Sequence, residues 1–336
     1  MQKISIIEHT LLTENVLKRL ANRRILTILD FLNEDVDKIS CAAKITIPQV
    51  LDIRNQIFDK YSAPVLCGLI LLERHLNKCL NTGIESINTM LNEGVPIGHI
   101  TELCGLANSG KTQLCHQLAV NCVKHTENTV LYIDTKGDFS AKRIQFLLHS
   151  YKKSYKEMAE IMFKIKVTRI WNMEELIELL QNLKKGTIVL NKLSMIIVDS
   201  LPCLMLQHLG EESKIGLALL NQFVNYCRFL CDHLQICVVC VNVQTRWVDQ
   251  DLVELEDEKK HYSTSFQEPT YVEKQNRCLG KYWQHIPALV LLLDKNPLLD
   301  NEVDDNTIRQ LSLSVLTSNS KVLKQCNLTL SSTGVR

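Results

Sequence analysis

The chain has 336 residues, and its 38 lysines and arginines against 37 aspartates and glutamates leave a net charge of +1. This balance excludes a molecule-wide field that would attract nucleic acid or membranes, so any such contact must be local. The length predicts one or two domains. Thirteen cysteines without framework spacing, no signal-type segment at the start and no apolar run long enough to cross a bilayer predict a soluble protein of a reducing compartment, cytosol or nucleus.

The first 60 residues carry apolar side chains at helical spacing and little else. Two stripes, within residues 11–20 and 25–32, predict helices. A third helix is expected to start at Ile47-Pro48, because proline fits a first helical turn. We therefore predict a small helical domain over residues 1–60, a linker over 61–80 and a second domain over 81–336.

The second domain contains a P-loop, the pattern G-x-x-x-x-G-K-T, between an apolar strand pattern and a helical one. Glycines let backbone N–H groups wrap phosphates, and the helix N-terminus favours negative charge. Lys111 is expected to reach the β- and γ-phosphates, and the Thr112 hydroxyl to bind Mg²⁺. The sequence thus predicts binding of a nucleoside triphosphate, ATP, with Mg²⁺. The predicted nucleotide-binding residues of the loop are Gly105, Leu106, Ala107, Asn108, Ser109, Gly110, Lys111 and Thr112.

Beyond the P-loop, strand and helix patterns alternate. Such alternation predicts an α/β fold with a mostly parallel sheet and helices on both faces. Cys237 and Cys240 lie three residues apart in one strand pattern, so they should face opposite sides of the sheet and act as core residues instead of a redox or metal pair. Strands are expected at 130–134, 164–170, 194–200, 236–242 and 288–294, helices from 140 and at 173–183 and 215–233, and two antiparallel strands at 310–317 and 326–331.

Asp199 ends the apolar strand pattern 194–200. A carboxylate at the end of a strand on the same sheet as a P-loop matches the Walker B position, which holds Mg²⁺ through water. Ligands of open α/β sheets bind at the carboxyl ends of the strands. We therefore predict that Asp199 joins Thr112 at the metal.

The order of these segments resembles the RecA-type recombinase family. The similarity covers roughly residues 10–336, and its motifs lie at 82–91 and 98–103, in the P-loop, and at 131–135, 198–200 and 241–242. At 279–287 the chain is most similar to the D-type paralogue of the eukaryotic strand-exchange recombinase. The resemblance implies a RecA-like ATP-binding core behind a helical N-terminal domain. It further implies a nuclear protein of homologous-recombination DNA repair that assembles with other recombinase paralogues and promotes recombinase loading or stability on single-stranded DNA.

Two departures from the family's pattern concern ATP hydrolysis. Lys136 stands where the family has its hydrolytic glutamate, and a protonated lysine cannot accept a proton from the attacking water. Asp138 is the remaining candidate for that role if its loop brings it inward, and otherwise it is a solvated loop residue. Val243 stands where the recombinases place a γ-phosphate-sensing glutamine, and Gln244, one residue later, is expected to face the other side of the strand, so nucleotide sensing by this route is not expected. Hydrolysis by the isolated chain is therefore expected to be weak.

The segment 249–278 follows, where recombinases contact single-stranded DNA. It starts with six acidic residues within 249–258, which repel phosphates, so a solvated insertion is expected there, or a DNA contact formed only in a complex. Residues 61–80 also lack the Phe-x-x-Ala segment that recombinases use to polymerise. These features favour a subunit of a paralogue complex. The alternatives are an autonomous DNA-dependent ATPase that forms its own filaments, or another class of P-loop protein, although neither a kinase lid nor an ABC signature is recognisable.

Overall fold

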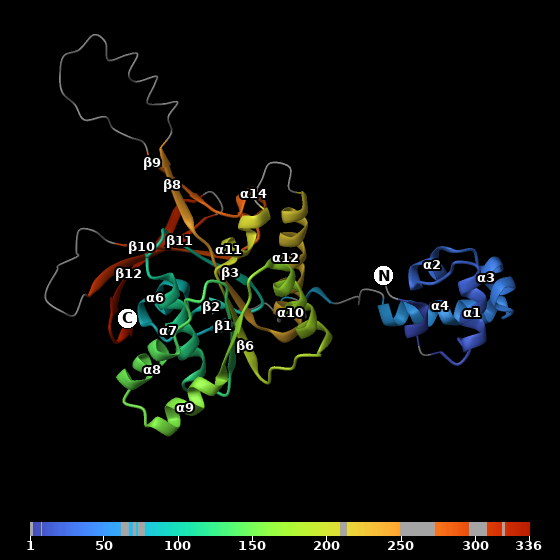
Figure 1. Ribbon diagram of the computed structural model, residues 1–336, viewed down its shortest axis with the longest axis horizontal. Helices are drawn as coiled ribbons and strands as arrows, with labels where there is room; N and C mark the ends of the chain where they lie inside the picture. The colour runs from blue at the N-terminus through green and yellow to red at the C-terminus, as the bar shows by residue number, and fades with distance from the viewer. Residues whose placement is uncertain are drawn as a thin grey trace, which may run out of the picture. The chain divides into compact units, whose positions relative to one another are not determined.

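The computed structural model describes residues 3–7, 9–61, 67–69, 72, 78–208, 214–248, 273–295, 308–317 and 320–336. The chain divides into two compact units, residues 1–74 and 75–336 (Figure 1). Each unit has its own apolar core. No helix in the described parts of the chain is long and apolar enough to span a membrane.

The first unit is helical. Thr27 forms a capping box with Asp30, and Asp35 caps the next helix, so polar side chains satisfy the free backbone amides at both starts. Leu20 and Phe31 are fully buried in its core. The helix expected at Ile47-Pro48 is α4, whereas α3, which precedes it, was not predicted from sequence periodicity. The elements are η1 (Ile4–Ile6), α1 (Glu14–Asn22), α2 (Ile28–Asn33), α3 (Val36–Ala43) and α4 (Ile47–Tyr61).

The second unit is built on a nine-stranded sheet with the order β13-β12-β11-β10-β3-β7-β6-β4-β5. The strands from β10 to β5 are parallel, and β11, β12 and β13 add an antiparallel edge. The strands of this sheet are β3 (Ile100–Cys104), β4 (Thr129–Asp134), β5 (Ile165–Arg169), β6 (Leu193–Asp199), β7 (Cys237–Val241), β10 (Leu289–Lys295), β11 (Arg309–Leu316), β12 (Val322–Ser331) and β13 (Gly334–Val335). This arrangement confirms the predicted α/β fold class.

Two short strand pairs lie outside the large sheet. One joins β1 (Cys79–Leu80) to β2 (Val95–Pro96), so the last two residues of the segment interpreted as a linker form a strand of the second unit. The other joins β8 (Gln244–Val248) to β9 (Glu273–Arg277). The sequence predicted neither β8 nor β9, and β9 lies within the segment 249–278. The acidic residues 249–258 lie outside the described residues.

Helices cover both faces of the sheet (Figure 1). One face packs against α6, α7, α8 and α9, and the other against α10, α11, α12 and α14. α9 was not predicted from the sequence. The helices are α6 (Glu85–Leu91), α7 (Lys111–Val123), α8 (Ala141–Ser150), α9 (Tyr155–Lys164), α10 (Met173–Lys185), α11 (Leu201–Met205) with η2 (Leu206–His208), α12 (Lys214–Leu234) and α14 (Gly280–Trp283).

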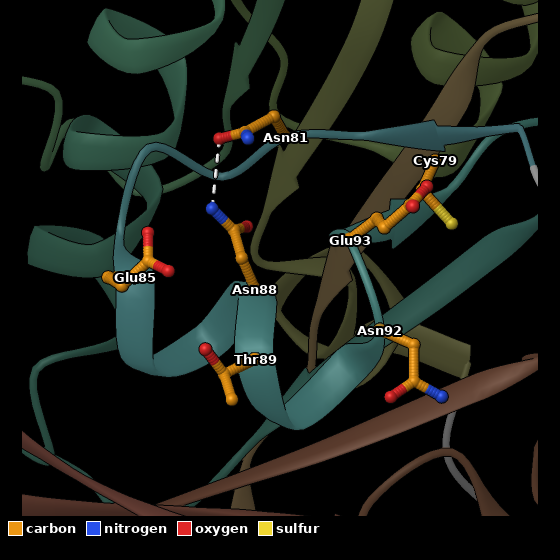
Figure 2. Close-up of a pocket in the computed structure, with 7 residues that line it drawn as sticks. All are labelled: Cys79, Asn81, Glu85, Asn88, Thr89, Asn92 and Glu93. Carbon is orange, nitrogen blue, oxygen red and sulfur yellow. Dashed lines mark hydrogen bonds between the residues drawn. The ribbon is translucent and has the colours of Figure 1, made fainter.

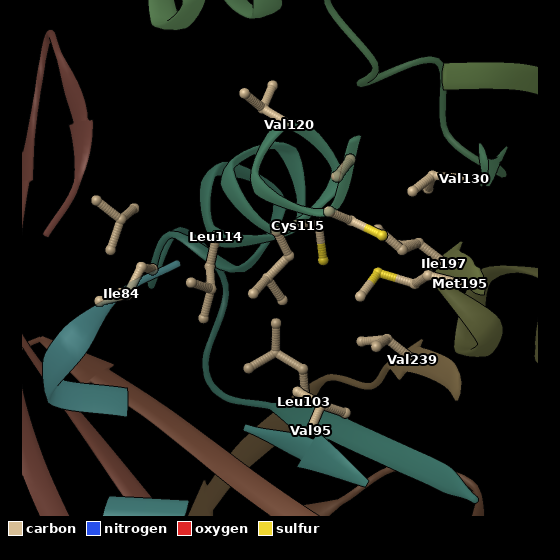
Figure 3. Packing of buried hydrophobic residues seen from close by; sticks show 14 of the residues in the cluster. Ile84, Val95, Leu103, Leu114, Cys115, Val120, Val130, Met195, Ile197 and Val239 are labelled. Carbon is tan, nitrogen blue, oxygen red and sulfur yellow. The ribbon is translucent and has the colours of Figure 1, made fainter. Parts of the chain in front are cut away.

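The two core clusters follow from the alternation of strand side chains. Leu114 and Cys115 of α7 pack on the face that carries Leu103, Ile197 and Val239 (Figure 3). Neighbouring strand positions face the other cluster. α7, the helix that follows the P-loop, is therefore anchored along the central strands of the sheet.

The alternation of strand side chains also places the cysteines. Cys237 belongs to one core cluster and Cys240 to the other, which confirms that they lie on opposite faces. Burial raises the pKa of Cys122 to about 11 and that of Cys231 to about 12. Most cysteines thus act as small core residues. Cys41 and Cys67 are exposed.

Candidate nucleotide-binding site

The P-loop connects β3 to α7 at the carboxyl ends of the parallel strands. Its first residue, Gly105, has a φ of +154°, and an added Cβ would lie 2.3 Å from the carbonyl oxygen of Leu293. No other residue type fits there without moving the neighbouring strand. Gly110, with φ of +96°, ends the loop as the N-cap of α7. The free backbone amides of the helix start are then available for an anion.

Lys111 is buried at the start of α7. Its Nζ donates to the carbonyl oxygens of Gly105, at 3.0 Å, and Leu106, at 2.6 Å. Burial lowers the pKa of Lys111, and the positive charge of Lys136 lowers it further. Two cations thus act on the mouth of the loop, an arrangement suited to a polyanionic ligand.

Asp199 ends β6 and is buried beside α7. Its Oδ2 accepts hydrogen bonds from the hydroxyl of Thr112, at 2.7 Å, and from the hydroxyl of Tyr132, at 2.8 Å. Its Oδ1 is buried and has no hydrogen-bond partner within the described residues. A buried carboxylate oxygen without a partner next to a threonine hydroxyl fits Mg²⁺, a hard cation that prefers oxygen ligands and keeps several waters. The structure thus brings together the two residues predicted at the metal.

The loop after β4 holds both residues considered for hydrolysis. Asp134, buried at the end of the strand, accepts backbone hydrogen bonds at its Oδ1 from Lys136 (3.3 Å), Gly137 (2.8 Å) and Asp138 (3.1 Å). These bonds fix the backbone of the loop, and the side chains of Lys136 and Asp138 are exposed. A role of Asp138 in hydrolysis stays a prediction.

Gln244 lies beside the P-loop. Its backbone N–H donates to the carbonyl oxygen of Gly105 at 3.0 Å, and its side chain is buried. The side-chain Oε1 has no hydrogen-bond partner in the part of the chain that the structure describes. Although Gln244 is one residue later than the glutamine of the family's pattern, the two residues that join β7 to β8 place it next to the first glycine of the loop.

Sequence reasoning missed a buried ion pair behind the P-loop. Glu102 of β3 accepts from Arg277 of β9 at 2.9 Å and from the Asn242 side chain at 2.7 Å. Burial raises the pKa of Glu102, and this effect outweighs the lowering by the charge of Arg277. A glutamate inside an apolar strand was the available sequence signal. Its partner lies 175 residues away, so the sequence alone could not name it.

A separate polar pocket of about 500 Å³ opens beside α6 (Figure 2). Its lining shares no residue with the P-loop, and the Asn81 and Asn88 side chains within it are hydrogen-bonded to each other. The described residues contain no group of three His, Cys, Asp or Glu side chains that could hold a metal ion.

The sequence pattern of the Rad51 family matches residues 73–263, more than half of the chain. "DNA repair protein RAD51 homolog 4" of Mus musculus is 28% identical over 291 residues, covering 84% of this chain and 82% of that protein. The Bos taurus protein of the same name is 28% identical over 295 residues with the same shares. "DNA repair protein RAD51" of Saccharomyces cerevisiae is 29% identical over 189 residues, 54% of this chain and 46% of that protein. These similarities confirm the resemblance to the D-type paralogue.

Proposed function

The chain belongs to the Rad51 family, and from this premise we propose that it binds ATP with Mg²⁺ and acts in homologous-recombination DNA repair as a subunit that assembles with other recombinase paralogues. The observation that supports nucleotide binding is the arrangement of Lys111, Thr112 and Asp199 at the end of the central strands. Lys111 would hold the β- and γ-phosphates, and Thr112 and Asp199 would hold Mg²⁺, which neutralises charge on the phosphate oxygens.

ATP would serve mainly to stabilise assembly. Lys136 places a cation where a general base would be needed. The isolated chain is therefore expected to bind ATP and to hydrolyse it slowly. A ligand bound only by the assembled state stabilises that state by RT ln(1 + [L]/Kd). Binding of ATP at a subunit interface therefore favours the complex even when hydrolysis is slow.

The complex would promote recombinase loading or stability on single-stranded DNA in the nucleus. The support for this role is the similarity to relatives named as DNA repair proteins. The near-neutral charge of the chain fits a subunit that meets DNA within a complex, because a net charge of +1 gives little attraction of its own to phosphates.

One observation favours the second candidate, an autonomous DNA-dependent ATPase that forms its own filaments. The Gln244 side chain is buried beside the P-loop, and its amide oxygen has no hydrogen-bond partner among the described residues, which leaves that oxygen available to a bound nucleotide. Lys136 and the acidic residues 249–258 stand against this candidate.

Co-expression with candidate paralogues, followed by purification with and without ATP, tests the proposal. We expect at least one paralogue to co-purify with the wild-type chain and the yield to fall when ATP is withheld. The Lys111→Ala variant should lose the ATP effect, while Lys124→Ala, at the far end of the same helix, should retain it. Recovery of an active homofilament from the chain alone would support the second candidate instead.

A further inference from the structure

The two oxygens of Asp199 have different surroundings. Oδ2 accepts from Thr112 and Tyr132, whereas the buried Oδ1 has no hydrogen-bond partner within the described residues. The Thr112 hydroxyl belongs to the P-loop helix and is the expected metal ligand. Tyr132 belongs to β4 and lies outside the P-loop. Its hydroxyl therefore holds Asp199 from a strand that makes no predicted contact with the nucleotide.

The phenol ring of Tyr132 is fixed by its neighbours. It is fully buried, with ring centroids 4.9 Å from Phe139 and 5.6 Å from His116. β4 and β6 are paired in register, with Tyr132 opposite Ile197 and Asp134 opposite Asp199. The hydroxyl thus reaches Asp199 from an adjacent, hydrogen-bonded strand.

We propose that Tyr132 is a positioning residue for the metal carboxylate: its hydroxyl holds Oδ2 of Asp199, which leaves Oδ1 for the water shell of Mg²⁺. Hydrogen-bond partners of metal-binding side chains fix the orientation of those side chains and tune metal affinity. This inference rests on the proposed binding of ATP with Mg²⁺.

The test measures how strongly Mg²⁺ improves nucleotide binding. The full-length wild type and Tyr132→Phe are titrated with N-methylanthraniloyl-ATP in EDTA and at rising Mg²⁺ concentrations. Phenylalanine keeps the ring that packs on His116 and Phe139 and removes only the hydroxyl. Tyr151→Phe is the matched control, because the Tyr151 hydroxyl also bonds buried side chains, those of Gln117 and Asn121, but does not contact Asp199.

For Tyr132→Phe, we expect the half-saturating Mg²⁺ concentration to rise about tenfold or more, with affinity in EDTA unchanged. Tyr151→Phe should behave as wild type in both conditions. In an Asp199→Asn background, Tyr132→Phe should add nothing to the loss of Mg²⁺ dependence. Thermal unfolding of each sample checks that the variants are folded.

Three results would overturn the inference. A Tyr132→Phe protein with wild-type Mg²⁺ dependence would show that the hydroxyl does not position Asp199, while the proposed function would stand. An equal loss of affinity with and without Mg²⁺ would show a structural role only. A wild-type chain that binds no nucleotide would overturn the proposed function and the inference together.

Discussion

At the residue scale, Lys111 shows most directly what the P-loop is built to bind. Its ammonium is buried among carbonyl oxygens, and the nearest charges include a second cation, Lys136. Replacing Lys111 by alanine should remove a charge-assisted contact to the phosphates worth about 1.5–3 kcal/mol. We expect ATP affinity to fall about tenfold or more. Titration with a fluorescent ATP analogue measures the change.

The control for this variant is Lys124→Ala. Lys124 caps the other end of α7, where its Nζ lies 4.1 Å from the centre of the Tyr151 ring. The Lys124→Ala substitution removes one positive charge from the same helix, as Lys111→Ala does, but leaves the phosphate site unchanged. Equal affinities of the two variants would contradict a special role of Lys111.

Lys136 gives the prediction about hydrolysis. The loss of a general base typically lowers rates by about 10²- to 10⁴-fold, so we expect slow turnover by the wild type and faster turnover by Lys136→Glu. Lys136→Glu should still bind ATP, because the P-loop contacts are unchanged, but more weakly than the wild type, because a positive charge near the phosphates becomes negative. A coupled phosphate-release assay on the isolated chain and on its complex measures both rates.

Asp138→Ala is the companion variant for that assay. Asp138 is exposed, and its backbone N–H is fixed by Asp134. If wild-type turnover is fast and Asp138→Ala abolishes it, Asp138 is the base and our interpretation of Lys136 is wrong. A fast rate that depends on neither residue would mean that the hydrolytic position lies elsewhere.

At the scale of elements, the ion pair between Glu102 and Arg277 joins β3 to β9 behind the P-loop. Removing one partner of a buried pair leaves the other charge uncompensated, which costs about 3–5 kcal/mol. We expect Arg277→Met to lose about this much stability in chemical denaturation at pH 8. The exposed Arg309 provides the control variant Arg309→Met, which should change little.

The pH dependence of that loss has a defined sign. Burial already raises the pKa of Glu102, and removing Arg277 raises it further, because the guanidinium lowers it in the wild type. A carboxyl with a raised pKa in the folded state favours folding below its unfolded pKa, and this stability is lost as pH rises through the folded pKa. The destabilisation of Arg277→Met should therefore be smaller at pH 5 than at pH 8. A pH-independent loss would show that packing, not charge, is responsible.

Elements with strong periodicity were predictable from the sequence, and weakly patterned ones were not. The buried parallel strands and α7, α10 and α12 follow long apolar patterns with clear boundaries. α9 buries only Met158 and Ile161, although Ser154 and Glu157 form a capping box that signals its start. The pair of β8 and β9 joins residues separated by a long segment, and such pairing leaves no local pattern.

The same distinction applies to the site. The spacing of the P-loop and the strand end at Asp199 singled out residues that the structure brings within hydrogen-bond distance. Tyr132 reaches Asp199 because β4 pairs with β6, and Arg277 reaches Glu102 because β9 pairs with β8. A single sequence reveals neither pairing. The position of Gln244 could not be predicted, because it depends on the path of the chain between β7 and β8. That path keeps Gln244 beside the P-loop despite its shift of one residue in the sequence.

At the scale of the whole molecule, the division into residues 1–74 and 75–336 predicts separable partner binding. The helical unit has its own core but no P-loop, so we expect it to dock one paralogue and the ATP-binding unit to dock another. A fragment of residues 75–336, which retains β1, should keep one partner and lose the other in co-purification. Loss of both partners by a fragment that circular dichroism shows to be folded would contradict this division.

The placement of the cysteines makes that division directly observable by chemistry. Maleimides and iodoacetamides react with thiolates, and burial raises the pKa of thiols such as Cys122 and Cys231. Cys41 and Cys67 are exposed, and both belong to the first unit. A thiol-reactive dye at neutral pH should therefore mark the helical unit first. If an added paralogue protects Cys41 from the dye, that paralogue covers the surface of the helical unit around Cys41.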